Sequence, residues 1–281
     1  MGTVAALCRY PVKSMLGEAL TAVRVTEEGL FGDRVFGVLD ERGAVGSVKH
    51  PRKWAPLLHC RSWLAGSGTV QVELPDGAVL PAGTVELGAR LSDLLGRRVS
   101  VSDSPPEYGT LERAVPEYEG EVPGTLRDRA FMDETGDTIT SGRVASGTFF
   151  DYGKVHLVTT ASLRRLRQVY PAGDFAPRRF RPNVVVELPG GPGFPEDSWV
   201  GSTLRIGEAL FQVTVPTPRC VVPTLSHDEL TADPGIMRAV AREHRIPVLS
   251  LGPLSCLGVY LDVLEPGAVR KGDAVTIDAG R

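Results

Sequence analysis

Cysteine is scarce in this chain of 281 residues, and none of the four cysteines lies in a CxxC pair. Their wide separation excludes a sequence-encoded zinc knuckle and a ferredoxin-like cluster. The five histidines form no HxH or HExxH pair, which argues against a histidine-rich metal site. There is no Walker A loop and no Rossmann fingerprint, so nucleotide cofactors of those two kinds are disfavoured.

Long apolar runs and a strong charge of either sign are also missing. No 18 consecutive apolar residues occur, and no basic region precedes an apolar stretch at the start. With 31 Lys and Arg against 34 Asp and Glu, the net charge is -3, which gives no general reason to expect a nucleic-acid polymer or a membrane surface as partner. We therefore expect a cytoplasmic globular protein without a membrane segment. The length allows one large domain or two smaller ones, and we predict two.

Short strand-like runs separated by turn residues are what the chain does contain. Pro75-Asp76-Gly77 and Asp40-Glu41-Arg42-Gly43 are the clearest hairpin turns. The 32 glycines and 22 prolines are spread over the whole length, which favours a barrel or sandwich. The fold class is predicted to be mostly β with a few helices (α+β). Strands are expected within residues 3–12, 20–26, 34–40, 70–74, 97–103, 183–188, 209–215, 256–264 and 274–278.

Two segments predict helices. In residues 159–171, Thr159 or Thr160 can cap the helix and Pro171 ends it. In residues 232–247, Asp233 can cap the start with Pro234 in the first turn, and the helix ends before Pro247. The predicted buried faces consist of Leu163, Leu166, Val169 and Tyr170 in the first helix and Ile236, Met237 and Val240 in the second.

A proline-rich, acidic stretch with little periodicity, residues 102–125, separates the two halves of the chain. We predict an N-terminal β-barrel-like domain over residues 1–105, a connecting segment over 106–127 and a second domain over 128–281. A long surface loop within one domain is the alternative.

Cys220 lies in PTPRCVVPT, directly after the apolar run of residues 209–215. A neighbouring cation such as Arg219 favours the thiolate form of a cysteine, which both a nucleophile and a soft metal site require. A buried, structural cysteine is the other interpretation, and the local sequence leaves the choice open. For Cys8, Cys60 and Cys256, which lie in or beside strand-like runs, the structural interpretation is preferred.

Several groups could bind an anion. They are Lys13-Ser14, Arg34 after Asp33, and the arginines 178, 179 and 181 that precede Asn183. Taken singly, each fits a solvated turn or a basic strand edge equally well. A cysteine hydrolase that pairs Cys220 with a histidine also stays open.

The ordered motifs YPVKS, GDRVFGVLD, TTASL, RFRPNVVVE, PEDSW, PRC and GPLSCLGVYLDVLEPGAVRKGDAV span nearly the whole chain. Together they resemble MOSC-domain proteins with an N-terminal MOSC β-barrel domain. That group includes the amidoxime-reducing component and the YcbX-type N-hydroxylamino reductases. The resemblance implies two packed β-rich domains, the C-terminal one a MOSC β-barrel, with a cofactor cleft between them.

The cofactor implied by the resemblance is Mo-molybdopterin, a molybdenum atom on one pterin dithiolene. By similarity Cys220 is the metal ligand and the catalytic residue. The implied cofactor-binding residues are Lys13, Ser14, Arg34, Thr159, Thr160, Ser162, Arg181, Asn183 and Arg219.

Two prolines depart from the family pattern. Pro218 and Pro223 stand where the amidoxime-reducing relatives have a serine and a threonine, which puts the substrate range in doubt. The chain has no ferredoxin domain after its MOSC part, so the electron donor is expected to be a separate protein of the ferredoxin or flavin reductase type.

The function implied by the resemblance is a molybdenum-dependent oxidoreductase that removes oxygen from small N-hydroxylated substrates. Two alternatives are a sulfur carrier or sulfurtransferase with a persulfide on Cys220, and a protein that binds or carries the molybdenum cofactor without turnover.

Overall fold

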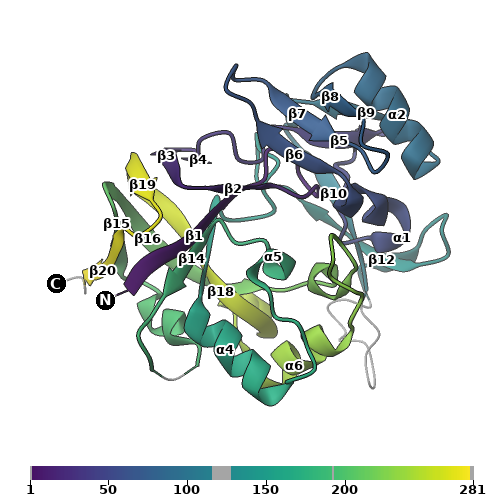
Figure 1. The fold of residues 1–281 in the computed structure, drawn as a ribbon. Coiled ribbons are helices and arrows are strands. Elements are labelled where there is room, and N and C mark those ends of the chain that lie inside the picture. Colours follow the sequence, from purple (N-terminus) through teal and green to yellow (C-terminus); the bar gives the residue numbers. More distant parts are fainter. Residues whose placement is uncertain (1, 116–127, 192, 279–281) are drawn as a thin grey trace. The chain divides into compact units, whose positions relative to one another are not determined.

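The computed structural model describes residues 2–115, 128–191 and 193–278, and the chain divides into two compact units (Figure 1). We call the unit formed by Met1–Arg9, Ala19–Phe31 and Gly153–Arg281 the barrel unit. The unit formed by Tyr10–Glu18 and Gly32–Tyr152 is called the sheet unit. Both units are discontinuous in sequence. The predicted domains, by contrast, are continuous and are separated by the connecting segment 106–127. The first strand of the chain lies in the barrel unit because its pairing partners are strands from the C-terminal half.

Seven strands close into a ring in the barrel unit, in the order β13-β14-β1-β20-β15-β16-β18, with β18 pairing back onto β13. Only β13 and β14 pair in parallel, and α4 lies between them in sequence. Burial alternates strictly along β16, so every second side chain enters the core, as at Phe211 and Val213. The predicted mostly-β fold with a C-terminal barrel is therefore confirmed. The ring strands are β1 (Gly2–Arg9), β13 (Val155–Thr159), β14 (Val184–Glu187), β15 (Thr203–Ile206), β16 (Ala209–Pro218), β18 (Pro253–Glu265) and β20 (Ala274–Asp278).

The two predicted helices lie in the barrel unit as α4 (Thr160–Val169) and α6 (Gly235–Glu243). Thr159 caps α4 by accepting a hydrogen bond from the Ser162 backbone N–H. Asp233 accepts one from the Gly235 N–H at the start of α6. Apolar side chains of both helices pack with Val158 and Leu257 of the barrel strands. The remaining elements are β2 (Glu18–Leu20), β3 (Ala22–Thr26), β4 (Gly29–Leu30), α5 (Pro177–Phe180), η2 (Pro195–Trp199), η3 (Val222–Thr224), β17 (Arg245–Pro247), η4 (Leu249–Leu251) and β19 (Gly267–Arg270).

Three small antiparallel sheets make up the sheet unit, in the orders β5-β9, β6-β7-β8 and β10-β12-β11. Its strands are β5 (Gly37–Asp40), β6 (Arg61–Leu64), β7 (Val70–Glu73), β8 (Val79–Pro81), β9 (Val99–Ser102), β10 (Thr110–Ala114), β11 (Ala130–Met132) and β12 (Thr138–Arg143). Its helices are α1 (Pro51–Trp54), η1 (Ala55–His59) and α2 (Val85–Leu95).

Two features of the sheet unit differ from the sequence-based expectations. Helix α2 was not predicted, because Gly88 and polar residues interrupt its apolar stripe of Leu87 and Leu91. Strand β10 lies inside the predicted connecting segment and pairs with β12. The rest of that segment, residues 116–127, lies outside the described residues.

The strand and turn predictions agree with the structure. Each of the nine predicted runs contains a strand. Gly77 and Gly43 adopt positive φ in the two predicted turns. Among the described residues, no helix has the length and apolar character needed to cross a membrane.

Candidate functional site

Cys220 lies at the end of β16, where the strand leaves the ladder it forms with β18. Pro218 is the last paired residue of β16, and the Arg219 backbone N–H still donates to the Ser255 carbonyl at 2.8 Å. The Cys220 side chain is partly exposed on the turn that follows. Cys60 and Cys256, by contrast, are fully buried, and burial raises the pKa of both thiols to about 12. These two thiols stay protonated near neutral pH, which agrees with a structural role for them. Cys8 and Cys220 are both partly exposed, and Cys220 is the one that the sequence motifs mark as the candidate.

The side chain of Arg219, the residue before Cys220, is held by the last residue of helix α5, Phe180. One of its terminal nitrogens donates to the Phe180 carbonyl at 2.8 Å, and its guanidinium lies 5.8 Å from the centre of the Phe180 ring. Its Nε is buried and has no hydrogen-bond partner among the described residues. A buried donor without a partner is costly, so this atom marks a place where an acceptor or an anion would be stabilised.

Arg179 fixes the segment that follows Cys220, a role that the sequence did not indicate. The side chain is fully buried on α5. Its nitrogens donate to the carbonyl oxygens of Pro223 at 3.2 Å and Thr231 at 2.8 Å, and to that of Asp174 at 2.7 Å. Because guanidinium has five donors in a rigid fork, one side chain joins three chain segments around the turn.

Asn183 has internal partners in the barrel wall. Its Oδ1 accepts from the His156 backbone N–H at 3.1 Å, and its Nδ2 donates to the Cys8 carbonyl at 3.3 Å. The side chain is buried and joins β13 to β1. The structural role of Asn183 is to join β13 to β1 through these two hydrogen bonds. Its contact with a cofactor stays a prediction.

Thr159 and Ser162 are also buried, and their hydroxyls both donate to the Glu196 carboxyl group at 2.7 Å. Thr160, on the same helix, is half-buried and accepts a weak bond from the Leu188 N–H at 3.5 Å. Burial raises the pKa of Glu196 despite the two hydroxyl donors. The predicted TTAS motif thus surrounds a buried carboxyl group, and its contact with a cofactor stays a prediction.

Glu196→Gln is expected to change how stability depends on pH. A carboxyl group with a raised folded-state pKa binds a proton more tightly when folded, so wild-type stability falls as pH rises from its unfolded pKa, about 4.3. The amide of Gln does not titrate. The free energy of unfolding of wild type minus that of Glu196→Gln should therefore fall as pH rises above about 4.3. Urea unfolding across that range measures it, with the exposed Glu187→Gln as control, and a flat difference would contradict it.

Lys13 lies buried in the sheet unit and is already paired. Its Nζ donates to the Phe149 carbonyl and to Asp151, both at 2.6 Å, and Lys49 contacts the other oxygen of Asp151 at 2.6 Å. Burial lowers the pKa of Lys13 to about 8, against the opposing effect of Asp151. The two lysines hold the pKa of Asp151 well below its ordinary value, even though burial opposes this.

Arg34 and Ser14 lie in the same unit. Arg34 forms an ion pair with the buried Asp33, and its guanidinium lies 5.3 Å from the Tyr10 ring and 5.5 Å from the Phe150 ring. Ser14 donates to the Gly46 carbonyl at 3.2 Å. Three cations, Lys13, Lys49 and Arg34, thus meet two carboxylates, Asp33 and Asp151. This group carries a surplus positive charge that would favour an anion.

Backbone conformation singles out three of the predicted residues. Six non-glycine residues have positive φ in the described part of the chain, and Ser14, Arg34 and Arg181 are three of them. Left-handed backbone costs about 1–2 kcal/mol for such residues and tends to persist where function requires it. The structure brings Lys13 and Arg34 together in the sheet unit, whereas Arg219 and Cys220 in the barrel unit are neighbours in the chain. The roles of Lys49, Asp151 and Glu196 were missed, because no local motif marks partners that lie far apart in the chain.

Comparison with known proteins gives two matching family models: "MOSC domain" over residues 146–276 and "MOSC N-terminal beta barrel domain" over residues 1–92. The chain is 25% identical to Mitochondrial amidoxime reducing component 2 of Rattus norvegicus, over 98% of this chain and 83% of that protein. It is 26% identical to Mitochondrial amidoxime-reducing component 1 of Mus musculus, over 98% of this chain and 82% of that protein.

Two solved structures show weaker similarity. The YUAD protein from Bacillus subtilis aligns over 100% of this chain and 97% of its own, with 12% identity and a TM-score of 0.47. YiiM from Geobacillus stearothermophilus aligns over 45% of this chain and 54% of its own, with 19% identity and a TM-score of 0.33.

Proposed function

Because this chain belongs to the MOSC-domain proteins that carry an N-terminal MOSC β-barrel domain, we propose that it is a molybdenum-cofactor-dependent oxidoreductase acting on N-hydroxylated compounds. The observation that carries the proposal is the pair of Cys220 and Arg219. A partly exposed cysteine directly follows, in the chain, an arginine whose buried Nε has no hydrogen-bond partner among the described residues. The amidoxime-reducing names of the relatives support the same reaction class.

The residues present fit the donor set that such a cofactor needs. A thiolate of Cys220 is a suitable ligand for a metal already bound by sulfur. By the family resemblance, Arg219, Arg181, Lys13 and Arg34 would bind the phosphate and pterin oxygens. Ser14, with its left-handed backbone, and Thr160 would add hydroxyl contacts. When bound, the molybdenum would supply the oxygen-atom chemistry that no side chain provides.

The protein's own residues would then hold and orient the cofactor. The β16–β18 ladder and Arg179 fix the turn that carries Cys220, so its sulfur would be presented in one position. Thr159, Ser162 and Asn183 are hydrogen-bonded inside the barrel unit, and their contact with the cofactor is part of this proposal. A separate electron-donor protein would supply electrons, and the substrate would be a small N-hydroxylated molecule. The predicted cytoplasmic location stays a prediction.

Molybdenum analysis tests the proposal. Wild type purified from a molybdenum-replete host should carry about one molybdenum per chain, because a single cysteine is the protein ligand. Cys220→Ala should lose it, and Cys8→Ala, a matched change at another partly buried cysteine, should keep it. Wild type loaded in this way should reduce an N-hydroxylated test compound with an artificial reductant, and Cys220→Ala should not.

Two other outcomes would contradict the proposal. Wild type without molybdenum, but with Cys220 heavier by one sulfur atom, would favour the sulfur carrier. A loaded protein that reduces none of a panel of hydroxylamines, amidoximes and N-hydroxylated bases would favour a cofactor carrier.

A further inference from the structure

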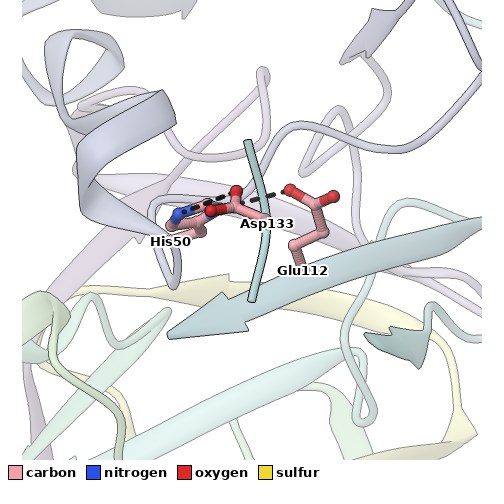
Figure 2. A group of neighbouring side chains, drawn as sticks. All are labelled: His50, Glu112 and Asp133. Carbon is pink, nitrogen blue, oxygen red and sulfur yellow. Dashed lines mark hydrogen bonds and ion pairs between the residues drawn. The ribbon is translucent and has the colours of Figure 1, made fainter. Parts of the chain in front are cut away.

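A second group of ionisable side chains lies in the sheet unit, apart from the residues discussed above. Figure 2 shows three of its members, His50, Glu112 and Asp133, with their side chains directed toward one another. His50 precedes helix α1, Glu112 lies on β10, and Asp133 begins the β11–β12 turn. Their ligand atoms all lie within 4.8 Å of one another. The sequence could not indicate this group, because its members come from three separate segments.

The two ring nitrogens of His50 face different carboxylates. Nδ1 lies 3.2 Å from Glu112 Oε2. Nε2 lies 3.5 Å from Asp133 Oδ2 and 3.3 Å from Asp137 Oδ2. This is the arrangement of a metal-binding histidine, in which one nitrogen faces the metal ligands and the other donates to a carboxylate that fixes the ring. Glu112 would have the second role.

The separations of Nε2 from the two aspartate oxygens match the ligand spacing of a tetrahedral ion. With bonds of about 2.0–2.1 Å to nitrogen and oxygen, two ligands of tetrahedral zinc stand about 3.3 Å apart. The separations of Nε2 from the two aspartate oxygens are 3.5 and 3.3 Å. Thr135 Oγ1 also lies 3.3 Å from Nε2, so this nitrogen has three oxygen atoms within 3.5 Å.

Asp133 has one oxygen left for a ligand. Its Oδ1 accepts hydrogen bonds from the Thr135 N–H and hydroxyl and from the Asp137 N–H. Its Oδ2 accepts none, although the side chain is only 2% exposed and the atom is buried. A buried carboxylate oxygen without a hydrogen bond requires a compensating cation, and this oxygen points toward His50 Nε2 and the Lys53 ammonium.

Lys53 supplies part of that compensation. Its Nζ lies 2.7 Å from Glu112 Oε2, 2.7 Å from Glu134 Oε1 and 3.3 Å from Asp133 Oδ2. Arg52 pairs with Asp137 and Arg97 with Glu134, so three cations face the four carboxylates of Glu112, Asp133, Glu134 and Asp137. One positive charge is lacking when His50 is neutral, and a divalent ion would more than supply it.

We propose that His50 Nε2, Asp133 Oδ2 and Asp137 Oδ2 form a binding site for a divalent transition ion of the zinc type, with Glu112 orienting the imidazole. Imidazole and carboxylate together are a common donor set for zinc. The ion replaces the Lys53 ammonium at Asp133, and the flexible stem of Lys53 lets its charge stay with the more exposed Glu134. A fourth position is left for water or Thr135.

Cobalt(II) titration of the metal-free full chain tests the site, because tetrahedral cobalt absorbs in the visible and thiolate ligation adds separate bands. Wild type should bind one cobalt ion without thiolate bands, and zinc should displace it. His50→Gln and Asp133→Asn should each weaken binding about 100-fold, and Glu112→Gln about 10-fold, as expected of an outer partner. His59→Gln, at an exposed histidine of the same unit, should leave binding unchanged.

Lys53→Met provides a second, independent test, because this variant should bind zinc more tightly and keeps all of the proposed ligands. Removing the competing ammonium should tighten zinc binding about 10-fold, since one opposing charge close to Asp133 is gone. Zinc should also raise the thermal midpoint of Lys53→Met more than that of wild type. Thiolate bands in wild type, equal affinity in His50→Gln and Asp133→Asn, or a Lys53→Met protein that zinc does not stabilise would each overturn the proposal.

Discussion

Replacing Gly258 by alanine is expected to destabilise the barrel unit by about 3–5 kcal/mol, the sum of a left-handed backbone and a steric clash. Gly258 has a φ of +79° and lies in β18 where that strand meets β13. A Cβ atom built there would stand 2.2 Å from the Leu157 carbonyl oxygen and 2.7 Å from His156 Nε2. Backbone is the nearest obstacle, so no side-chain rotation relieves the clash.

The position also matters for Cys220. The pairing of β16 with β18 shifts register between Pro216 and Pro218, because three residues of β18 advance against two of β16. Gly258 is one of those three, and its positive φ is what a bulge of this kind requires. Disturbing it would disturb the last paired residues before Arg219 and Cys220. Under the proposed function, the variant should therefore also retain less molybdenum than wild type.

Gly201→Ala is the matched control for Gly258→Ala. Gly201 lies in the same unit with a φ of +88°, and no atom within 4 Å of a built Cβ would obstruct a side chain. Its replacement should cost only the backbone strain, about 1–2 kcal/mol. Urea unfolding of both variants measures the difference. Equal losses would show that the contact with Leu157 does not determine the need for glycine at 258.

Local signals predicted the strands and two helices well because they depend on neighbouring residues. The alternation in residues 209–215 became β16, and Thr159 caps α4 as its motif predicts. Helix α2 was missed because Gly88 lowers helix propensity in the middle of its pattern. The placement of β1 in the barrel unit was out of reach, since nothing in the local sequence of β1 says that its partners, β14 and β20, lie far along the chain.

The candidate site was predicted through motifs, and its environment was not. Cys220 and Arg219 are adjacent in sequence, so their pairing was visible. Asp151 reaches Lys13 across 138 positions, and Glu196 reaches Ser162 across 34. The local sequence around a carboxylate does not indicate which distant side chain will bind it, so such contacts can be identified only in the folded chain.

Arg179→Met is expected to destabilise the barrel unit by about 3–5 kcal/mol. The change removes donors from the carbonyls of Asp174, Pro223 and Thr231, and each buried acceptor left without a partner costs about 1–3 kcal/mol. Methionine fills much of the volume, so the loss should come mainly from the hydrogen bonds. Urea unfolding should show it as a lower midpoint with an unchanged slope.

The segment after Cys220 should respond more than the rest of the unit. Arg179 joins α5 to both sides of this segment, at Pro223 and at Thr231, so its loss lets the turn move while the barrel strands stay paired. Alkylation of Cys220 in the native protein, followed by mass spectrometry, should therefore be faster in Arg179→Met. The buried Cys256 serves as an internal reference, because its exposure depends on β18 and not on the turn.

Arg178→Met is the matched control, since it removes the same type of side chain from the preceding position of α5. The Arg178 side chain is 46% exposed and forms an ion pair with the exposed Glu229 at 3.2 Å. An exposed pair of this kind contributes about 0–1 kcal/mol. If the two variants lose equal stability, or if Cys220 reacts no faster in Arg179→Met than in Arg178→Met, Arg179 does not position the Cys220 turn. Arg179→Lys should lie between wild type and Arg179→Met, because one ammonium cannot reproduce the fork that reaches three carbonyls.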